Sequence, residues 1–319
     1  MKKFMEFDNR LILVLVAAVG IYAVFLFMSD FNIMTEKISN FKIYFLPLIL
    51  LLVTVSWIPL MIRWQFLLKT AEIHIPFKKS ILVYLSGSAL QITPGQIGEL
   101  IKAQILKTSF GIPRTKTASV VLVEKIYDLI GAIIASIIGM IILELEIYLI
   151  IFAILILFLI FFFFYYKPAF EFFLRQIIKT KFFSKYTENI SESYEIIKKI
   201  TAPQIAIRSI FLSITYWFVV SIAVYCTLLA FDIDILSYLK VLSIFTTSTI
   251  LGAITFIPGG IGVTEGSIAG LFTLEGIHMS TALVLGVMIR IVTLWYNVSI
   301  GFIALKFSGF SFKKDFPKE

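Results

Sequence analysis

Ionisable side chains within long apolar stretches are the residues of this sequence that could do chemistry. Glu124, Lys125 and Asp128 lie together in one such stretch, and Arg290 lies in another. A charged side chain at the centre of a membrane helix costs about 2.5–3.5 kcal/mol on insertion scales, so these groups point to function. A helix would bring Asp128 within reach of both Glu124 and Lys125. Such a cluster could bind a charged ligand or carry protons.

Two Pro-Gly sequences interrupt apolar stretches, and a glutamate follows each of them. The first reads Pro94-Gly95-x-x-Gly98 with Glu99 next, and the second reads Pro258-Gly259-x-x-Gly262 with Glu265 shortly after. Proline removes a backbone donor and glycine permits a positive φ, so a helix stops at each point. The half-helix that follows offers free N–H groups and a positive dipole end, which attract an anion.

These features together predict a substrate-binding site suited to an anionic head group such as a phosphate. The predicted site consists of Thr93, Gln96, Gly98, Glu99, Glu124, Lys125, Asp128, Gly259, Gly262, Thr264, Glu265 and Arg290. No catalytic residue, metal site or cofactor is predicted, because the two histidines lie in different connections and Cys226 is alone.

Structural roles for the same residues stay open at this point. Glu99 and Glu265 could cap half-helices, and Lys125 with Asp128 could be a structural pair. Arg290 could tie two helices through a glutamate. Asn297 is more typical of a helix–helix hydrogen bond than of a ligand.

The elements that must position these residues are membrane helices. The chain is 59% hydrophobic and 15% charged, whereas a soluble domain carries about 25% charged residues. This composition excludes a soluble globular enzyme and a disordered chain. Helices solve the backbone hydrogen-bonding problem in lipid, so we predict an all-α polytopic membrane protein. Its six predicted transmembrane helices are 11–29, 43–62, 117–142, 146–166, 204–230 and 280–306, with no cleaved signal peptide.

Residues 80–107 and 239–275 are predicted to form re-entrant hairpins, since each apolar stretch breaks at its Pro-Gly sequence. The distribution of charge agrees with this topology. With both termini cytoplasmic, 23 of the 28 basic residues fall inside, Lys37, Lys42 and Lys240 fall outside, and Lys125 and Arg290 lie in the membrane. Cytoplasmic loops of membrane proteins are enriched in Lys and Arg, so the net charge of +8 is mostly loop charge.

The two halves of the chain, 1–143 and 144–319, show the same predicted order of two spans, a broken hairpin and a third span. The Pro-Gly sequences are 164 residues apart, and three crossings in each half invert the second half relative to the first. Paired, interrupted segments at corresponding positions are typical of transporters built from inverted repeats.

The sequence resembles the transmembrane region of lysylphosphatidylglycerol synthases, a family that includes stand-alone, flippase-like membrane proteins. The matching residues are Thr93 to Glu99 with Lys102, Glu124 to Asp128, Ile257 to Gly266, and Arg290. The family usually has Glu-Arg where this chain has Glu124-Lys125, so the bidentate fork of arginine is missing there. The resemblance implies movement of a charged or glycosylated lipid, and it does not imply aminoacyl transfer.

We therefore expect a lipid flippase or scramblase in a prokaryotic cell membrane. Its lipid would carry an anionic or glycosylated head group, of the phospholipid or polyprenyl-phosphate type. The alternatives are a non-transporting partner subunit of a glycosyltransferase or lipid-modifying enzyme, an integral-membrane enzyme and a small-solute transporter. We do not expect an enzyme, because the sequence lacks an Asp-Asp or Asp-x-x-Asp cluster. No nucleic-acid partner is expected, and homo-oligomerisation stays open.

Overall fold

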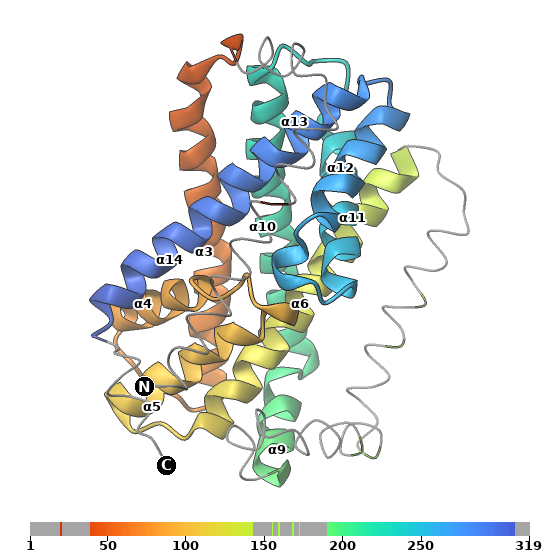
Figure 1. Cartoon of the computed structure of the whole chain (residues 1–319). Helices are drawn as coiled ribbons and strands as arrows, with labels where there is room; N and C mark the ends of the chain where they lie inside the picture. Colours follow the sequence, from red (N-terminus) through yellow and green to blue (C-terminus); the bar gives the residue numbers. More distant parts are fainter. Residues whose placement is uncertain are drawn as a thin grey trace.

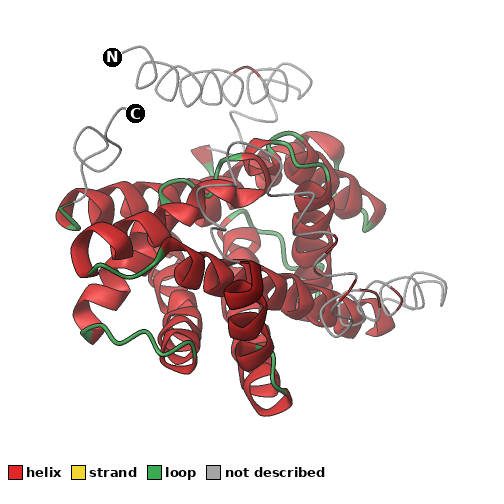
Figure 2. Ribbon diagram, turned by 90° about the horizontal axis from the view of Figure 1, so that it is seen from below, coloured by secondary structure: helices red, strands yellow, loops and turns green. Residues whose placement is uncertain are grey.

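The computed structural model describes residues 39–142 and 190–309, with a few isolated positions elsewhere. The regular structure of this part of the chain is entirely helical (Figure 2). Three of its helices, Ile43–Thr70, Pro203–Ala230 and Met279–Phe307, are long and apolar enough to cross a membrane. The protein is therefore a helical membrane protein. The predicted spans 11–29 and 146–166 lie outside the described residues.

The first described stretch runs from a long helix through a broken pair to a second long helix. A short 3-10 turn, η1 (Ile43–Phe45), leads into α3 (Leu46–Thr70). The broken pair is α4 (Phe77–Ser88) and α5 (Ile101–Phe110), joined through η2 (Pro94–Leu100). The long helix α6 (Arg114–Ile142) follows after Gly111, whose φ of 69° ends α5 in the left-handed conformation.

The second described stretch repeats that order after a short helix, α9 (Ile190–Ile200). The long helix α10 (Pro203–Ala230) precedes a broken pair, α11 (Tyr238–Ile254) and α12 (Val263–Leu274), separated by η4 (Pro258–Gly260). The last span contains α13 (Met279–Arg290), the π-helical η5 (Ile291–Trp295) and α14 (Tyr296–Phe307). Short π-helical segments inside longer helices often mark functional positions.

The packing pairs elements of one stretch with those of the other. α3 packs along α10, α6 packs on α11, and α14 packs on α4. In Figure 1, α13 and α14 cross the front of the molecule diagonally, from beside α12 to beside α4. Glycines allow two of these approaches: Gly301 lies against the backbone of Ala89, and Gly139 lies against Ser243. Small residues at helix contacts are typical of membrane proteins.

The helix breaks predicted at both Pro-Gly sequences are present, and η2 contacts η4. The predicted span 204–230 corresponds to α10, and 280–306 corresponds to α13 through α14. The span 117–142 lies within α6. The predicted span 43–62 lies in η1 and α3, and α3 continues beyond it to Thr70. Its last two turns stay helical since Trp64, Leu67 and Leu68 are all fully buried.

Candidate functional site

The first break, residues 89–100, turns on two consecutive residues in the left-handed conformation. Gly95 has φ 57° and Gln96 also has φ 57°, directly after Pro94, and Thr93 before the proline is extended. Glycine tolerates this conformation, whereas a residue with a Cβ is strained there by about 1–2 kcal/mol. The Thr93 hydroxyl stabilises the turn by accepting a hydrogen bond from the Gly98 backbone N–H at 2.7 Å. The break therefore holds Gln96 in an unfavourable backbone state.

Glu99, the last residue of this turn before Leu100, is bound by two lysines from opposite sides. The Lys102 Nζ lies 2.9 Å from one carboxylate oxygen, and the Lys125 Nζ lies 2.5 Å from the other. Lys102 also reaches the Glu124 carboxylate at 2.7 Å, so it bridges α5 and α6. Its exposed fraction is 0%, and a ring of Trp64 lies 4.8 Å from its Nζ. Lys102 is thus a fully desolvated cation with two carboxylate partners.

Arg63 brings a third element, α3, to the same carboxylates. Its Nη1 lies 2.7 Å from Asp128 and its Nη2 lies 3.6 Å from Glu124, and the guanidinium also donates to the Ser213 hydroxyl of α10. Arg63 has an exposed fraction of 0%. A buried charge of this kind persists only when it is paired. Arg63 therefore fixes α3 and α10 against the charged part of α6.

The residues joined in this way form the charge network: Arg63, Glu99, Lys102, Glu124, Lys125 and Asp128. Lys125 and Asp128 lie 3.6 Å apart and are its partly exposed members, with 28% and 21% of their side chains exposed. Lys125 also donates to the Gln96 amide oxygen at 3.0 Å. The strained Gln96 thus contributes its side chain to the accessible part of the network.

The second break, residues 255–262, also has two consecutive left-handed residues after its proline, and its charged group is smaller. Gly259 and Gly260 have φ of 62° and 63°, at the positions that correspond to Gly95 and Gln96. Arg290 donates from Nε to the Glu265 carboxylate at 3.0 Å and from Nη2 to the Gly259 carbonyl oxygen. Glu265 in turn accepts the Gly262 backbone N–H at 2.7 Å. Arg290 and Glu265 therefore pin the second break to the last span.

The start of α12 is occupied by groups of the protein itself. The Glu265 carboxylate caps its first turn, and Thr264 packs against Gly260 and Gly252 with 2% exposure. The free N–H group that the sequence suggested for an anion at Gly262 is bonded to this carboxylate. Glu265 therefore caps the start of α12, which is one of the structural roles that the sequence left open for it.

The structure divides the predicted site residues into two groups. The first group holds Thr93, Gln96, Gly98, Glu99, Glu124, Lys125 and Asp128, and the second holds Gly259, Gly262, Thr264, Glu265 and Arg290. The breaks touch where Gly95 packs against the ring of Phe256. Asn297 donates to Gln91 at 2.7 Å, so its hydrogen bond joins the last span to the turn of the first break rather than to a second helix.

The predicted site omits Arg63 and Lys102, although Lys102 is one of the residues that carry the family resemblance. Both were counted among the 23 basic residues on the cytoplasmic side, whereas in the structure both side chains lie on helices and are fully buried. The signal for Lys102 was its position three residues after Glu99, a spacing that favours an ion pair on a helix. For Arg63 the signal was the apolar pattern that continues through Leu67 and Leu68.

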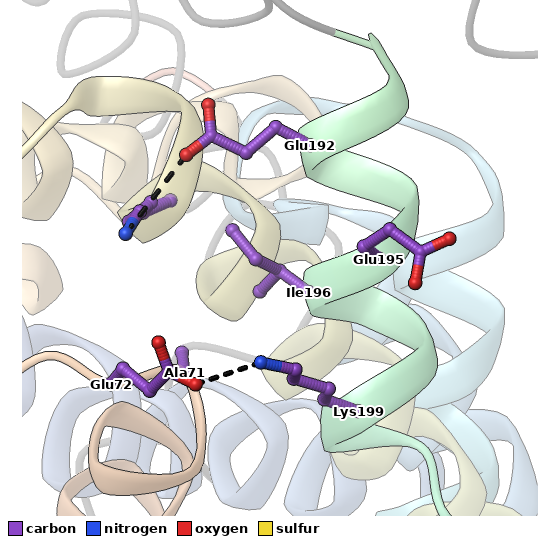
Figure 3. A pocket seen from close by; sticks show the side chains of 7 residues that line it. Ala71, Glu72, Glu192, Glu195, Ile196 and Lys199 are labelled. Carbon is purple, nitrogen blue, oxygen red and sulfur yellow. Dashed lines mark hydrogen bonds and ion pairs between the residues drawn. The ribbon is translucent and has the colours of Figure 1, made fainter.

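A separate charged groove lies between the end of α3, the start of α6 and α9. It is lined by Ala71, Glu72, Lys116, Glu192, Glu195, Ile196 and Lys199 (Figure 3). Lys199 binds Glu72 at 2.8 Å and lowers the pKa of that carboxyl. The exposed ion pairs of this groove hold α9 beside α3 and α6, and their residues do not contact the charge network.

Comparison with known proteins agrees with the arrangement of the breaks and their charged partners. Residues 13–301 match the family described as the lysylphosphatidylglycerol synthase TM region. The chain belongs to this family. The UPF0104 membrane protein PH1989 of Pyrococcus horikoshii is 24% identical over 317 residues, which cover 91% of this chain and 94% of that protein.

A UPF0104 membrane protein of Methanothermobacter thermautotrophicus is 29% identical over 100 residues, 31% of this chain. That match spans only 29% of the relative's length. A second match to a protein of this name and organism is 30% identical over 90 residues, covering 28% of this chain and 27% of the relative. These relatives are archaeal membrane proteins, and the family name relates this chain to lipid handling.

Proposed function

We propose that the protein moves a lipid with a charged head group between the leaflets of a prokaryotic cell membrane, and that it acts as a transporter without catalysing a reaction. The observation that carries the proposal is the charge network at the first break. Buried charges inside a helical membrane protein are costly, and they commonly mark the path of a polar substrate. The partly exposed Lys125 and Asp128 give this network an accessible side.

An inverted repeat supports a transport cycle. We infer that residues 1–143 and 144–319 are the two repeats, with α3, α4, α5 and α6 matching α10, α11, α12 and the α13–α14 span. The matching left-handed residues at both breaks support this correspondence. The contacts support it too. Exchanging the repeats turns α6 into the α13–α14 span and α11 into α4, so the contact of α6 with α11 becomes the contact of α14 with α4, and both are present. Transporters of this kind bind substrate where the interrupted segments of the repeats meet.

Ion pairs between connections support the proposed topology, with two re-entrant hairpins and cytoplasmic termini. Lys42 pairs with Asp232, and both belong to connections that the sequence assigns to the outside. Lys199 pairs with Glu72, and Lys116 lies 4.0 Å from Glu192, all in connections assigned to the inside. Each pair joins residues that the proposed topology places on one side of the membrane.

The test is lipid movement by the purified full chain in liposomes. Phospholipids that carry a fluorophore on an acyl chain are included, and a membrane-impermeant quencher reports the fraction in the outer leaflet. We expect faster exchange than in protein-free liposomes. Lys125→Gln should slow it by at least about tenfold, the factor implied by losing a hydrogen bond to a charged group.

The matched control is Lys78→Gln, the same change at an exposed lysine in the first turn of α4. It should leave the exchange rate unchanged. Exchange that matches protein-free liposomes for anionic, zwitterionic and glycosylated lipids alike would overturn the proposal. That outcome would favour the alternative of a non-transporting partner subunit.

A further inference from the structure

The charge network is electrically balanced, and this restricts the head groups that it can accept. It contains three cations, Arg63, Lys102 and Lys125, and three carboxylates, Glu99, Glu124 and Asp128. The second break adds the balanced pair of Arg290 and Glu265. A ligand with a net charge would therefore enter a site whose own charges already cancel, and the excess charge would remain uncompensated away from water.

The partly exposed members of the network present one charge of each sign. The Lys125 Nζ and the Asp128 Oδ2 are 3.6 Å apart, and both side chains are more than one-fifth exposed. The remaining members are at most 7% exposed. An incoming head group can therefore meet an ammonium and a carboxylate side by side, while the other charges stay paired among themselves.

The contacts of this pair also let it exchange partners without leaving a buried charge alone. If a ligand takes Lys125 from Glu99, that carboxylate keeps the Lys102 Nζ at 2.9 Å. If a ligand takes Asp128 from Lys125, that carboxylate keeps the Arg63 Nη1 at 2.7 Å. The fully buried cations thus hold the carboxylates in place during the exchange. Lys125 and Asp128 can then each bind a ligand charge.

Resting on the proposed function, we propose that the lipid is zwitterionic, with a phosphate and a primary amine joined by a short link. The phosphate binds Lys125 and the amide N–H group of Gln96, and the amine donates to Asp128. A phosphoethanolamine head group has this chemistry. An anionic phosphoglycerol head group offers Asp128 no cation, and a phosphocholine head group offers it no N–H donor.

The test compares the head groups directly, using the full chain in liposomes and the acyl-labelled lipids described above. The probes are phosphatidylethanolamine, phosphatidylglycerol and phosphatidylcholine. We expect the ethanolamine lipid to exchange at least about tenfold faster than the glycerol lipid, because its ammonium forms an ion pair with Asp128 that a neutral glycerol hydroxyl cannot form. Asp128→Asn should remove this preference and leave exchange of the glycerol lipid equal or faster.

The outcomes separate this inference from the proposed function. Equal exchange of all three lipids by the unmodified protein, or an equal slowing of all three by Asp128→Asn, would overturn the zwitterion assignment while transport itself stands. Exchange no faster than in protein-free liposomes would overturn the proposed function. Asp234→Asn, the same change on the exposed turn after α10, is the matched control and should keep the preference. If Asp128→Asn does not fold, the preference of the unmodified protein alone decides the matter.

Discussion

The two breaks share a pair of left-handed residues after the proline, but different charged groups surround them. At the first break, Glu99 is held by lysines from α5 and α6, and Arg63 of α3 completes the charge network. At the second break, Arg290 binds Glu265 and the carbonyl oxygen of Gly259, and Glu265 caps α12. The first network spans several elements and is partly exposed, while the second joins its turn to α13 and is at most 8% exposed.

This difference suggests a division of labour between the halves of the molecule. The redundancy of the first network lets Lys125 leave Glu99 while Lys102 remains bound. At the second break, Arg290 binds both the Glu265 carboxylate and the carbonyl oxygen of the turn, so losing it would release the turn as well as the carboxylate. We infer that the first break binds the head group and that the second break anchors the last span.

Loss of the cation at each break should give the largest contrast between them. Arg290→Gln removes the guanidinium from a carboxylate that is 0% exposed, and breaking a buried pair costs about 3–5 kcal/mol. Lys125→Gln should cost less than half as much, because Glu99 keeps Lys102. The free energy of unfolding in detergent micelles, measured by denaturant titration, provides the comparison.

The double variant Arg290→Gln/Glu265→Gln is the control for this contrast. Removing both charges leaves a neutral pair, so most of the lost stability should return. Equal losses for Arg290→Gln and Lys125→Gln would contradict the division of labour.

Much of this architecture could be predicted from the sequence, because the Pro-Gly turns are local features. A Pro-Gly pair favours a helix break locally, because the proline lacks a backbone donor and the glycine tolerates a positive φ, so both breaks were predictable without tertiary information. The matching positions of Glu99 and Glu265 after the breaks could be read in the same way. The family match over residues 13–301 agrees with the resemblance in those motifs.

The partners of each charge could not be predicted, since they depend on how distant helices pack. Arg63 lies near the end of an apolar stretch, where a snorkelling or loop position is the simpler interpretation. Arg63 and Glu124 are 61 residues apart in the sequence. Arg63 becomes part of the charge network only because α3 packs near α6. Likewise, Arg290 could be assigned to Glu265 rather than Glu99 only from the folded arrangement.

The corresponding residues Gln96 and Gly260 allow a smaller and more selective test. Gly260→Ala adds a Cβ at a φ of 63°, and that atom would lie 2.6 Å from the Thr264 Oγ1, so we expect a loss of about 1–3 kcal/mol. Gln96→Gly relieves the same backbone strain at the first break and should stabilise the fold by up to about 1 kcal/mol. It also removes the amide that binds Lys125, so lipid exchange should slow.

This opposition between stability and transport is the informative result, and both variants are measured by denaturant titration and by the liposome assay. If Gln96 is kept in its strained conformation because its side chain serves transport, its replacement should raise stability and slow lipid exchange. If the side chain has no such role, only the stability should change. Stabilisation by Gln96→Gly with unchanged lipid exchange would place Gln96 outside the binding site.

The smallest effect is expected at the exposed pair of Glu72 and Lys199, which lies apart from both breaks. Lys199 holds the pKa of Glu72 below its usual value of 4.5, so the charged carboxylate is favoured in the folded protein. Its contribution to stability is complete above the unfolded pKa and is lost as the pH falls through the lowered folded pKa. The unmodified protein and Glu72→Gln should therefore differ slightly at neutral pH and converge as the pH falls through the lowered folded pKa of Glu72. Thermal unfolding across this range is the measurement, with Glu195→Gln in the same groove as the control. A large loss at neutral pH would mean that surface ties, rather than the buried charges at the breaks, dominate the stability of the first half.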